Sequence, residues 1–226
     1  MGEVYKNPVK KLIPSKLETG LQKFLYKHVG PHIPSSATPN QVTAVSAIGG
    51  GFAVIMTLLT NFSYWFFIGT VAGLAVHIIA DDLDGYVARS RGMSSRAGAY
   101  FDLITDVLFS TFLIIAFGLT PCAHLLPSAL AAPLYGVMNV TMMNYIIYFN
   151  EFQFPRLGPI EAHLSYTAFA VLGAVFKDRA VFTLMGVGVT ACDIFMTAAM
   201  IPMYYEMFRM AVALFRRLSA EDKSKN

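Results

Sequence analysis

Five of the 14 acidic residues in this chain are aspartates that fall between positions 81 and 106: Asp81, Asp82, Asp84, Asp102 and Asp106. Asp81 and Asp84 are three residues apart, and Asp102 and Asp106 are four apart, so each pair would share one face of a helix. The polar segment around Met93 predicts a turn between two antiparallel helices. Because Asp84 and Asp102 are equally far from Met93, folding this hairpin would place the two carboxylate pairs at matching depth.

Clustered carboxylates without a cysteine or histidine pair suit hard cations that prefer oxygen ligands. The sequence therefore favours Mg²⁺ or Mn²⁺ over zinc, with enough carboxylates for two ions. Two ions about 3.5–4 Å apart would bind a pyrophosphate and its leaving phosphate together. Acids within a membrane also serve cation or proton transporters, so spacing alone favours an enzyme only slightly.

The composition indicates lipid as the main solvent of the chain. Hydrophobic residues make up 55% of it and charged residues 14%, whereas soluble domains carry about 25% charged residues. Six apolar blocks are each near the length of about 20 residues that a spanning helix needs: 41–61, 64–88, 97–120, 124–149, 160–176 and 180–214. We expect an all-α polytopic membrane protein with six transmembrane helices, and close helix packing at Gly49-Gly50-Gly51.

The basic residues predict the orientation. With both termini cytoplasmic, fifteen of the 17 Lys and Arg residues lie inside, and only Lys177 and Arg179 lie outside. This bias supports an even number of spans, with the aspartates at the cytoplasmic side of an inner or endomembrane. The first thirty residues lack the apolar core of a cleavable signal peptide. Because these charges flank membrane spans, nucleic acid is excluded as a partner.

Residues 15–30 predict an amphipathic helix that precedes the spans. Ser15 would cap it, Glu18 would complete a capping box, and Gly30-Pro31 would end it. An orientation on the anionic cytoplasmic leaflet is favoured over simple packing on protein. The expected organisation is a juxtamembrane segment 1–40, a six-helix catalytic domain 41–214 and a cytoplasmic tail 215–226.

One pattern is far more specific than these trends. Asp81-x2-Asp84-Gly85-x2-Ala88-Arg89-x8-Gly98-x3-Asp102-x3-Asp106 resembles the complete signature of the CDP-alcohol phosphotransferase family. The six spans, cytoplasmic termini and surface helix also resemble that family, as does Thr38-Pro39-Asn40-x2-Thr43 more weakly. The resemblance implies a phospholipid-synthesising enzyme that transfers a substituted phosphate from a CDP-linked donor to an alcohol and releases CMP. Family members are often homodimers, so a second copy is an implied partner besides the lipid bilayer.

The resemblance also implies roles for individual residues. Asp81, Asp84, Asp102 and Asp106 would bind the metals, and Asp106 would also act as general base on the acceptor hydroxyl. The implied nucleotide-binding residues are Asn40, Thr43, Asp81, Asp84, Gly85, Ala88, Arg89 and Gly98. Asp82 lies outside the signature. It could be an outer metal ligand or a polar residue at the cavity edge, and the sequence favours neither role.

The substrate stays open between two pairings: CDP-diacylglycerol with a small alcohol, or CDP-choline or CDP-ethanolamine with diacylglycerol. Val107, directly after Asp106, argues weakly against a phosphorylated acceptor. Glu161 could attract a cationic head group, although an acid favoured by the helix dipole explains it slightly better. His163 and Asp193 are further candidates for the acceptor side, and His77, one turn before Asp81, is a candidate support of the site.

Two rival functions make different demands on the sequence. Intramembrane prenyltransferases also bind pyrophosphate through aspartates and magnesium, but they need an acid where Gly85 stands here and a second aspartate-rich motif. A cation or proton transporter would distribute acids along a pathway across the membrane, whereas five gather near one surface here.

Overall fold

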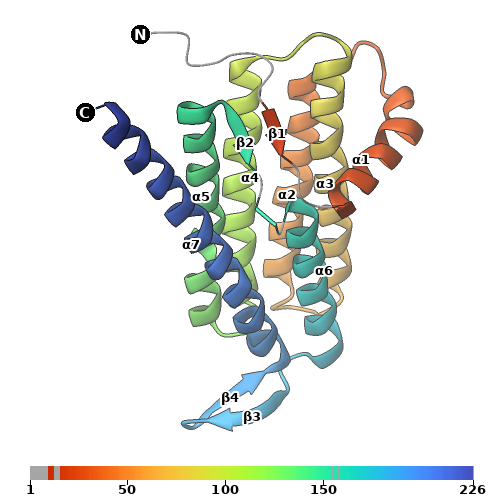
Figure 1. Ribbon diagram of the computed structural model, residues 1–226. Coiled ribbons are helices and arrows are strands. Elements are labelled where there is room, and N and C mark those ends of the chain that lie inside the picture. Colours follow the sequence, from red (N-terminus) through yellow and green to blue (C-terminus); the bar gives the residue numbers. More distant parts are fainter. Residues whose placement is uncertain (1–9, 13–15, 154, 157, 226) are drawn as a thin grey trace.

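The computed structural model describes the chain except residues 1–9, 13–15, 154, 157 and 226. It is a bundle in which successive long helices run in alternating directions (Figure 1). These helices are α2 (Pro39–Leu59), α3 (Phe66–Ser90), α4 (Arg96–Gly118), α5 (Leu125–Phe149), α6 (Pro159–Phe176) and α7 (Ala191–Lys225). Within the described residues, α2 to α6 are long and apolar enough to cross a membrane. The predicted all-α polytopic membrane fold is therefore confirmed.

The sixth apolar block, predicted at 180–214, was wrong at its start. Residues there form a hairpin of β3 (Ala180–Leu184) and β4 (Val187–Thr190), and α7 begins only at Ala191. Met185 and Gly186 form the turn, with φ of 52° and 83°. Positive φ at both residues is what a type I′ turn needs, and this turn matches the right-handed twist of the flanking strands. Hydropathy cannot separate such a β-branched apolar run from a helix, which is why the prediction failed.

The predicted surface helix is present as α1 (Lys16–His28), followed by the short 3₁₀ helix η1 (Gly30–His32). Its proposed cap, Ser15, lies outside the described residues. Leu25 is buried against the bundle, whereas Leu17 and Phe24 are exposed. Since α1 lies on the outside of the bundle (Figure 1), these exposed apolar side chains form a face suited to a membrane surface.

A short two-stranded sheet brings the N-terminal segment to the middle of the chain. Strand β1 (Lys10–Leu12) pairs in parallel with β2 (Glu151–Gln153), which follows α5. Helix α6 then begins lower in the bundle than the end of α5 (Figure 1). The non-helical segment between them lines the cavity described below, a setting in which irregular backbone is tolerated at membrane depth.

Glycines let α2 and α3 approach each other closely. A Cβ at Gly73 would lie 2.8 Å from both the Ala53 nitrogen and the Gly49 oxygen, and a Cβ at Gly50 would lie 2.6 Å from Phe109. By contrast, a Cβ at Gly51 would meet nothing within 4 Å. The predicted packing role is therefore met at Gly49 and Gly50 but not at Gly51.

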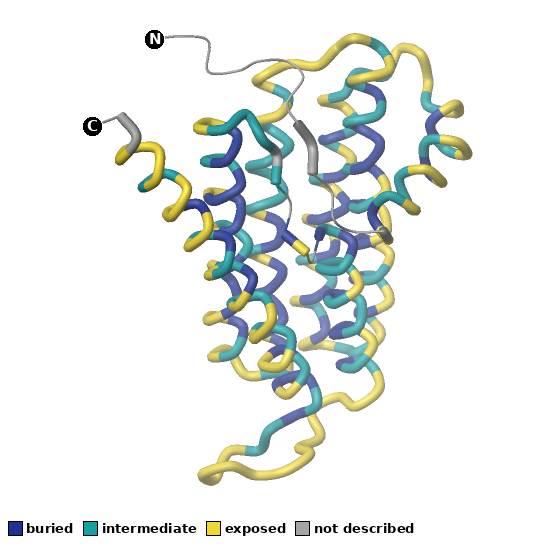
Figure 2. Tube along the Cα trace, viewed as in Figure 1, coloured by how far each residue is buried: buried dark blue, intermediate teal, exposed yellow. Residues whose placement is uncertain are grey.

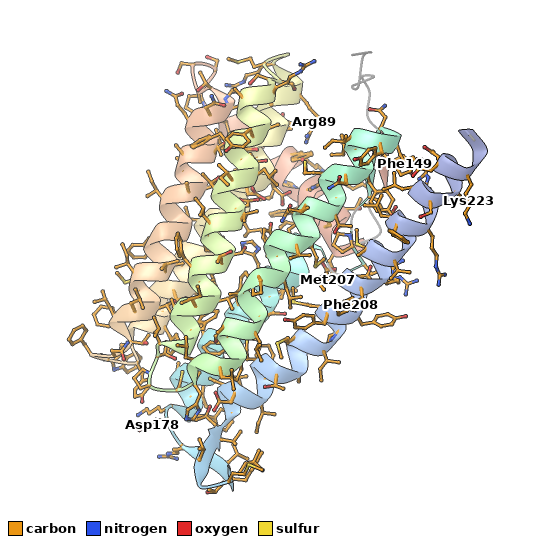
Figure 3. All side chains as sticks on the ribbon, turned by 90° about the vertical axis from the view of Figure 1, so that its left-hand side faces the viewer. Arg89, Phe149, Asp178, Met207, Phe208 and Lys223 are labelled. Atoms are coloured by element: carbon orange, nitrogen blue, oxygen red, sulfur yellow. The ribbon has the colours of Figure 1, made fainter. Side chains whose placement is uncertain are left out.

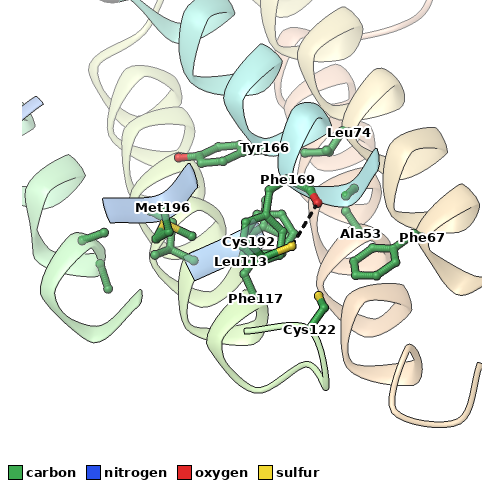
Figure 4. Packing of buried hydrophobic residues seen from close by; sticks show 14 of the residues in the cluster. Ala53, Phe67, Leu74, Leu113, Phe117, Cys122, Tyr166, Phe169, Cys192 and Met196 are labelled. Carbon is green, nitrogen blue, oxygen red and sulfur yellow. Dashed lines mark hydrogen bonds between the residues drawn. The ribbon is translucent and has the colours of Figure 1, made fainter. Parts of the chain in front are cut away.

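Side chains from α2 to α7 pack together in one hydrophobic core (Figure 4). Phe117 and Phe169 stack there with ring centroids 4.0 Å apart. Cys122 and Cys192 are fully buried in the same cluster. Figure 2 shows buried positions facing the bundle axis and exposed ones facing outward, with the hairpin and α1 largely exposed.

Gly73→Ala is expected to destabilise the protein by about 1–3 kcal/mol, because the added methyl group meets backbone that cannot move aside. Gly51→Ala is the matched control and should be neutral or stabilising by about 0.5–1 kcal/mol, from helix propensity alone. Thermal unfolding of both variants in detergent measures the difference. Equal melting temperatures would contradict the close α2–α3 packing.

Candidate active site

Three of the predicted aspartates meet between α3 and α4. One carboxylate oxygen each from Asp81, Asp102 and Asp106 lies within 4.8 Å of the other two. The hairpin turn between the helices is formed by Arg91 to Ser95, and Ser95 caps α4 by accepting a hydrogen bond from the Gly98 nitrogen at 3.0 Å. The i, i+4 spacing on α4 and the antiparallel crossing of α3 thus bring the acids together as the sequence predicted.

Asp84 lies on the same helix as Asp81 but outside this group of three. Its Oδ2 accepts a hydrogen bond of 2.6 Å from the Thr43 hydroxyl, and both side chains are buried. The Thr43 hydroxyl also lies 3.2 Å from the Pro39 carbonyl of its own helix, so α2 holds the group that orients this carboxylate. The residue predicted as a nucleotide contact therefore acts on Asp84, which in turn lines the cavity.

Sequence analysis missed a polar stripe on α1 that faces the aspartates. Glu18, Gln22 and Tyr26 all line the same cavity. The Gln22 amide donates to Glu18 at 2.9 Å and to Asp82 at 3.0 Å. Asp82 thus points to α1 rather than into the group of three, which supports its interpretation as a residue at the cavity edge. The i, i+4, i+8 spacing of the stripe is the signal that could have found it.

Arg89 connects the same stripe to the end of α3. Its guanidinium donates to the Tyr26 hydroxyl at 2.8 Å, and Tyr26 stacks on Tyr86 with ring centroids 5.0 Å apart. Burial raises the pKa of the Tyr26 phenol, although the neighbouring Arg89 charge opposes that shift. Tyr26 therefore stays neutral at physiological pH and keeps Arg89 directed at the mouth of the cavity, where Figure 3 shows it near the end of the bundle.

His77 supports the site from the side of the hydrophobic core. The Ser46 hydroxyl donates to the His77 carbonyl at 3.0 Å, so it can accept the proton of Nδ1, also at 3.0 Å. This pairing leaves Nε2 facing Asp106 Oδ1 at 3.8 Å. The buried His77 ring packs on Phe109 with centroids 3.8 Å apart, so it limits how far the Asp106 carboxylate can turn.

A cavity of about 680 Å³ joins these residues to the opposite wall of the bundle. All five aspartates of the 81–106 segment line it, with Gly85 and Arg89. Among the other predicted nucleotide residues, Asn40 and Gly98 lie side by side, since a Cβ at Gly98 would be 3.1 Å from the Asn40 Oδ1. Neither of them, nor Ala88 or Thr43, lines the cavity wall itself.

The opposite wall comes from α5, α6 and α7, and sequence analysis missed most of it. It contains Tyr135 and Asn139, together with Met138, Met142, Met143 and Met203. The Asn139 amide donates to the Tyr135 carbonyl at 2.9 Å. Their i, i+4 spacing could have predicted a polar face on α5, because residues four apart lie on the same side of a helix.

The three candidates for the acceptor side occupy different places. Glu161 accepts a hydrogen bond of 2.9 Å from the Gly158 nitrogen and caps α6, as the helix-start interpretation expects. His163 donates its Nδ1 proton to the Pro159 carbonyl at 2.9 Å and packs edge-on against His77 at 5.1 Å, behind the cavity wall.

Asp193 is far from the aspartate cluster. It accepts hydrogen bonds from the His124 ring at 2.7 Å and from the Thr190 nitrogen at 3.0 Å, next to the β3–β4 hairpin. This end of α7 is opposite to the end that carries α1 (Figure 1). The structure therefore does not bring Asp193 to the site but uses it to join the α4–α5 loop to the start of α7.

The donor set fits divalent metal ions. Three carboxylates offer oxygen ligands close together, with Asp84 adjacent on α3. In the described part of the chain, the buried Oδ1 of Asp102 has no hydrogen-bond partner. An unpaired buried carboxylate oxygen beside two further carboxylates is strongly disfavoured without a cation. Oxygen-only ligands suit Mg²⁺, Mn²⁺ or Ca²⁺.

Comparison with known proteins adds an independent observation. The chain is 26% identical over 129 residues to the bifunctional IPC transferase and DIPP synthase of Aquifex aeolicus (strain VF5). That match covers 55% of this chain and 28% of the relative, so the chain spans about a quarter of the relative's length.

The profile of the CDP-alcohol phosphatidyltransferase family matches residues 36–201, which include α2 to α6, the hairpin and the start of α7. The match contains the whole aspartate cluster and both helices that carry it. The chain belongs to the CDP-alcohol phosphatidyltransferase family.

Proposed function

We propose that this protein transfers a substituted phosphate group from a CDP-linked donor to an alcohol hydroxyl and releases CMP. The observation that carries the proposal is the meeting of Asp81, Asp102 and Asp106 within 4.8 Å on the wall of a large cavity. The family match supports the same chemistry, and it disfavours a prenyltransferase or a transporter.

Asp81, Asp84 and Asp102 are proposed as ligands of two divalent cations, Mg²⁺ or Mn²⁺. Bound there, the cations would neutralise the charge that develops on the leaving CMP. Thr43 fixes Asp84 through its 2.6 Å hydrogen bond, so this carboxylate presents its other oxygen to the cavity. Gly85 and Arg89 line the cavity and are the proposed nucleotide contacts, with Asn40 and Gly98 beside them and Ala88 keeping the α3 surface small.

Asp106 is proposed as the general base. It lies one helical turn beyond Asp102 and faces both the cavity and His77. A hydroxyl nucleophile needs a base within hydrogen-bond reach, and a carboxylate at this position can accept its proton. The Ser46–His77 pair stands behind the Asp106 carboxylate, with His77 Nε2 3.8 Å from Asp106 Oδ1.

The site and both termini are proposed to be cytoplasmic. The positive-inside bias supports this orientation, and α1, the α3–α4 turn and the C-terminal part of α7 lie towards the same end of the bundle (Figure 1). A homodimer is a prediction from the family resemblance.

Removing a metal ligand tests the first part of the proposal. Asp81→Ala and Asp102→Ala should each abolish Mg²⁺-dependent binding of CDP, because the remaining carboxylates cannot hold the cations. Isothermal titration calorimetry, in which CDP is titrated into each variant in the presence of Mg²⁺ or of EDTA, measures this loss. The control is Asp178→Ala, an exposed acid at the opposite end of the bundle (Figure 3). Unchanged binding in the Asp81 and Asp102 variants would refute the ligand assignment.

Asp106→Asn tests the base. The amide keeps the shape and one oxygen ligand but cannot accept a proton, so turnover should fall on the order of 10²–10⁴-fold. Mg²⁺-dependent CDP binding should persist. The two readouts are CMP release and CDP titration on the same preparation, and near-normal CMP release would remove Asp106 from this role.

A further inference from the structure

The cavity has two chemically different walls. Towards α1, α3 and α4 it carries the aspartates with Glu18, Arg89 and Arg96. The part bounded by α5, α6 and α7 contains Met138, Met142, Met143 and Met203, and we call it the methionine chamber. In this part, the described lining residues include no Lys, Arg, Asp or Glu. Unbranched, polarisable methionine side chains adapt to irregular apolar ligands.

The methionine chamber lies directly beside the proposed base. Val107, the residue after Asp106, packs towards α5, since its Cγ1 would be 3.9 Å from a Cβ at Gly136. Tyr135, next to Gly136, lines the same cavity as Asp106 and Asp81. A group accommodated by the methionine chamber can therefore present a hydroxyl to Asp106.

The geometry of the reaction places the acceptor on this side. Phosphoryl transfer requires the attacking and leaving oxygens to be roughly in line on opposite sides of the phosphorus. The leaving CMP is anionic and polar, so it belongs at the mouth of the cavity with Arg89 and Arg96. The attacking oxygen must then come from the opposite direction, which is the methionine chamber.

The methionine chamber offers few polar groups. Its described lining has the Tyr135 hydroxyl and the Asn139 side chain, and the Asn139 amide donates to the Tyr135 carbonyl of α5 at 2.9 Å. A phosphate or carboxylate on the acceptor would need cationic or multiple donor partners there. An uncharged apolar alcohol needs none beyond Asp106 for its hydroxyl.

On these grounds, and resting on the proposed function, we infer that the acceptor is an uncharged lipid alcohol of the diacylglycerol type. The donor is then a CDP-linked small alcohol. Glu18 and Asp82 add two carboxylates near the mouth, joined through Gln22, and they favour a donor whose alcohol carries an ammonium group. Val107, which argued weakly against a phosphorylated acceptor, faces Gly136 of α5.

The step balances as a single displacement. The acceptor hydroxyl oxygen forms a bond to the phosphorus that carries the small alcohol. The bond from that phosphorus to the oxygen bridging to the CMP phosphate breaks, and CMP leaves with this oxygen and its electron pair. The hydroxyl proton goes to Asp106.

A substrate panel on the full-length wild-type protein tests the inference. One arm supplies CDP-choline or CDP-ethanolamine with dioleoylglycerol in mixed micelles with Mg²⁺. The other supplies CDP-dioleoylglycerol with glycerol 3-phosphate, inositol 1-phosphate, glycerol or serine. We expect CMP release only in the first arm, and only when dioleoylglycerol is present.

The other outcomes of this panel distinguish a wrong acceptor assignment from a wrong proposed function. CMP release in the second arm alone overturns the acceptor assignment but keeps the proposed function. Mg²⁺-dependent CDP binding without CMP release in either arm also overturns the acceptor assignment. Loss of both CMP release and Mg²⁺-dependent CDP binding overturns the proposed function itself.

Filling the methionine chamber tests its location. Ala162→Phe, which adds a ring from the cavity-lining face of α6, should raise the KM for dioleoylglycerol about tenfold or more, the equivalent of about 1.4 kcal/mol. The KM for the CDP-linked donor should stay within about twofold, which corresponds to a few tenths of a kcal/mol. Leu164→Phe is the matched control, because this α6 side chain is exposed on the outside of the bundle.

An unchanged KM for dioleoylglycerol in Ala162→Phe would refute the assignment, as would an equal rise in both KM values. If Ala162→Phe does not fold, Met203→Phe places a ring in the same chamber from α7. The same selective rise in KM is expected, and its absence would again refute the assignment.

Discussion

The structure depends on one electrostatic constraint, which is that several carboxylates lie close together at the ends of membrane helices. Asp81, Asp102 and Asp106 approach within 4.8 Å, and Asp84 lies one turn away on α3. Like charges at this spacing repel, and a low-dielectric surrounding strengthens the repulsion. A divalent cation turns that repulsion into coordination. The surrounding hydrogen bonds hold the carboxylates in position for that cation.

Those hydrogen bonds come from two helices, α2 and α1. Helix α2 orients Asp84 through Thr43 and restrains His77 through Ser46. Helix α1 engages Asp82 through Gln22 and, through Tyr26, fixes Arg89 at the mouth of the cavity. The glycine contacts of α2 and α3 make the first set possible, since they bring Thr43 and Ser46 within hydrogen-bond reach of α3.

The proposed chemistry follows from the contrast between the two walls of the cavity. A charged wall with hard oxygen ligands suits a nucleotide pyrophosphate, and an apolar wall rich in methionine suits a lipid. Both walls belong to one cavity, so the reacting phosphorus can be approached from opposite sides as in-line displacement requires. Holding the two partners together in this way removes much of the entropic barrier to a reaction between a polar and a lipid-soluble substrate.

The aspartate spacing and the apolar block lengths by themselves determined the helical membrane fold, the α3–α4 hairpin and the convergence of its acids. These features are local, because helix periodicity decides which residues share a face. Only the tertiary structure decided that Thr43 binds Asp84, that α1 turns Glu18, Gln22 and Tyr26 towards the site, and that Asp193 lies far from it. It also decided that residues 180–190 form a hairpin instead of a span. Such pairings depend on how whole helices rotate and pack against one another, and hydropathy carries no information about rotation within an apolar bundle.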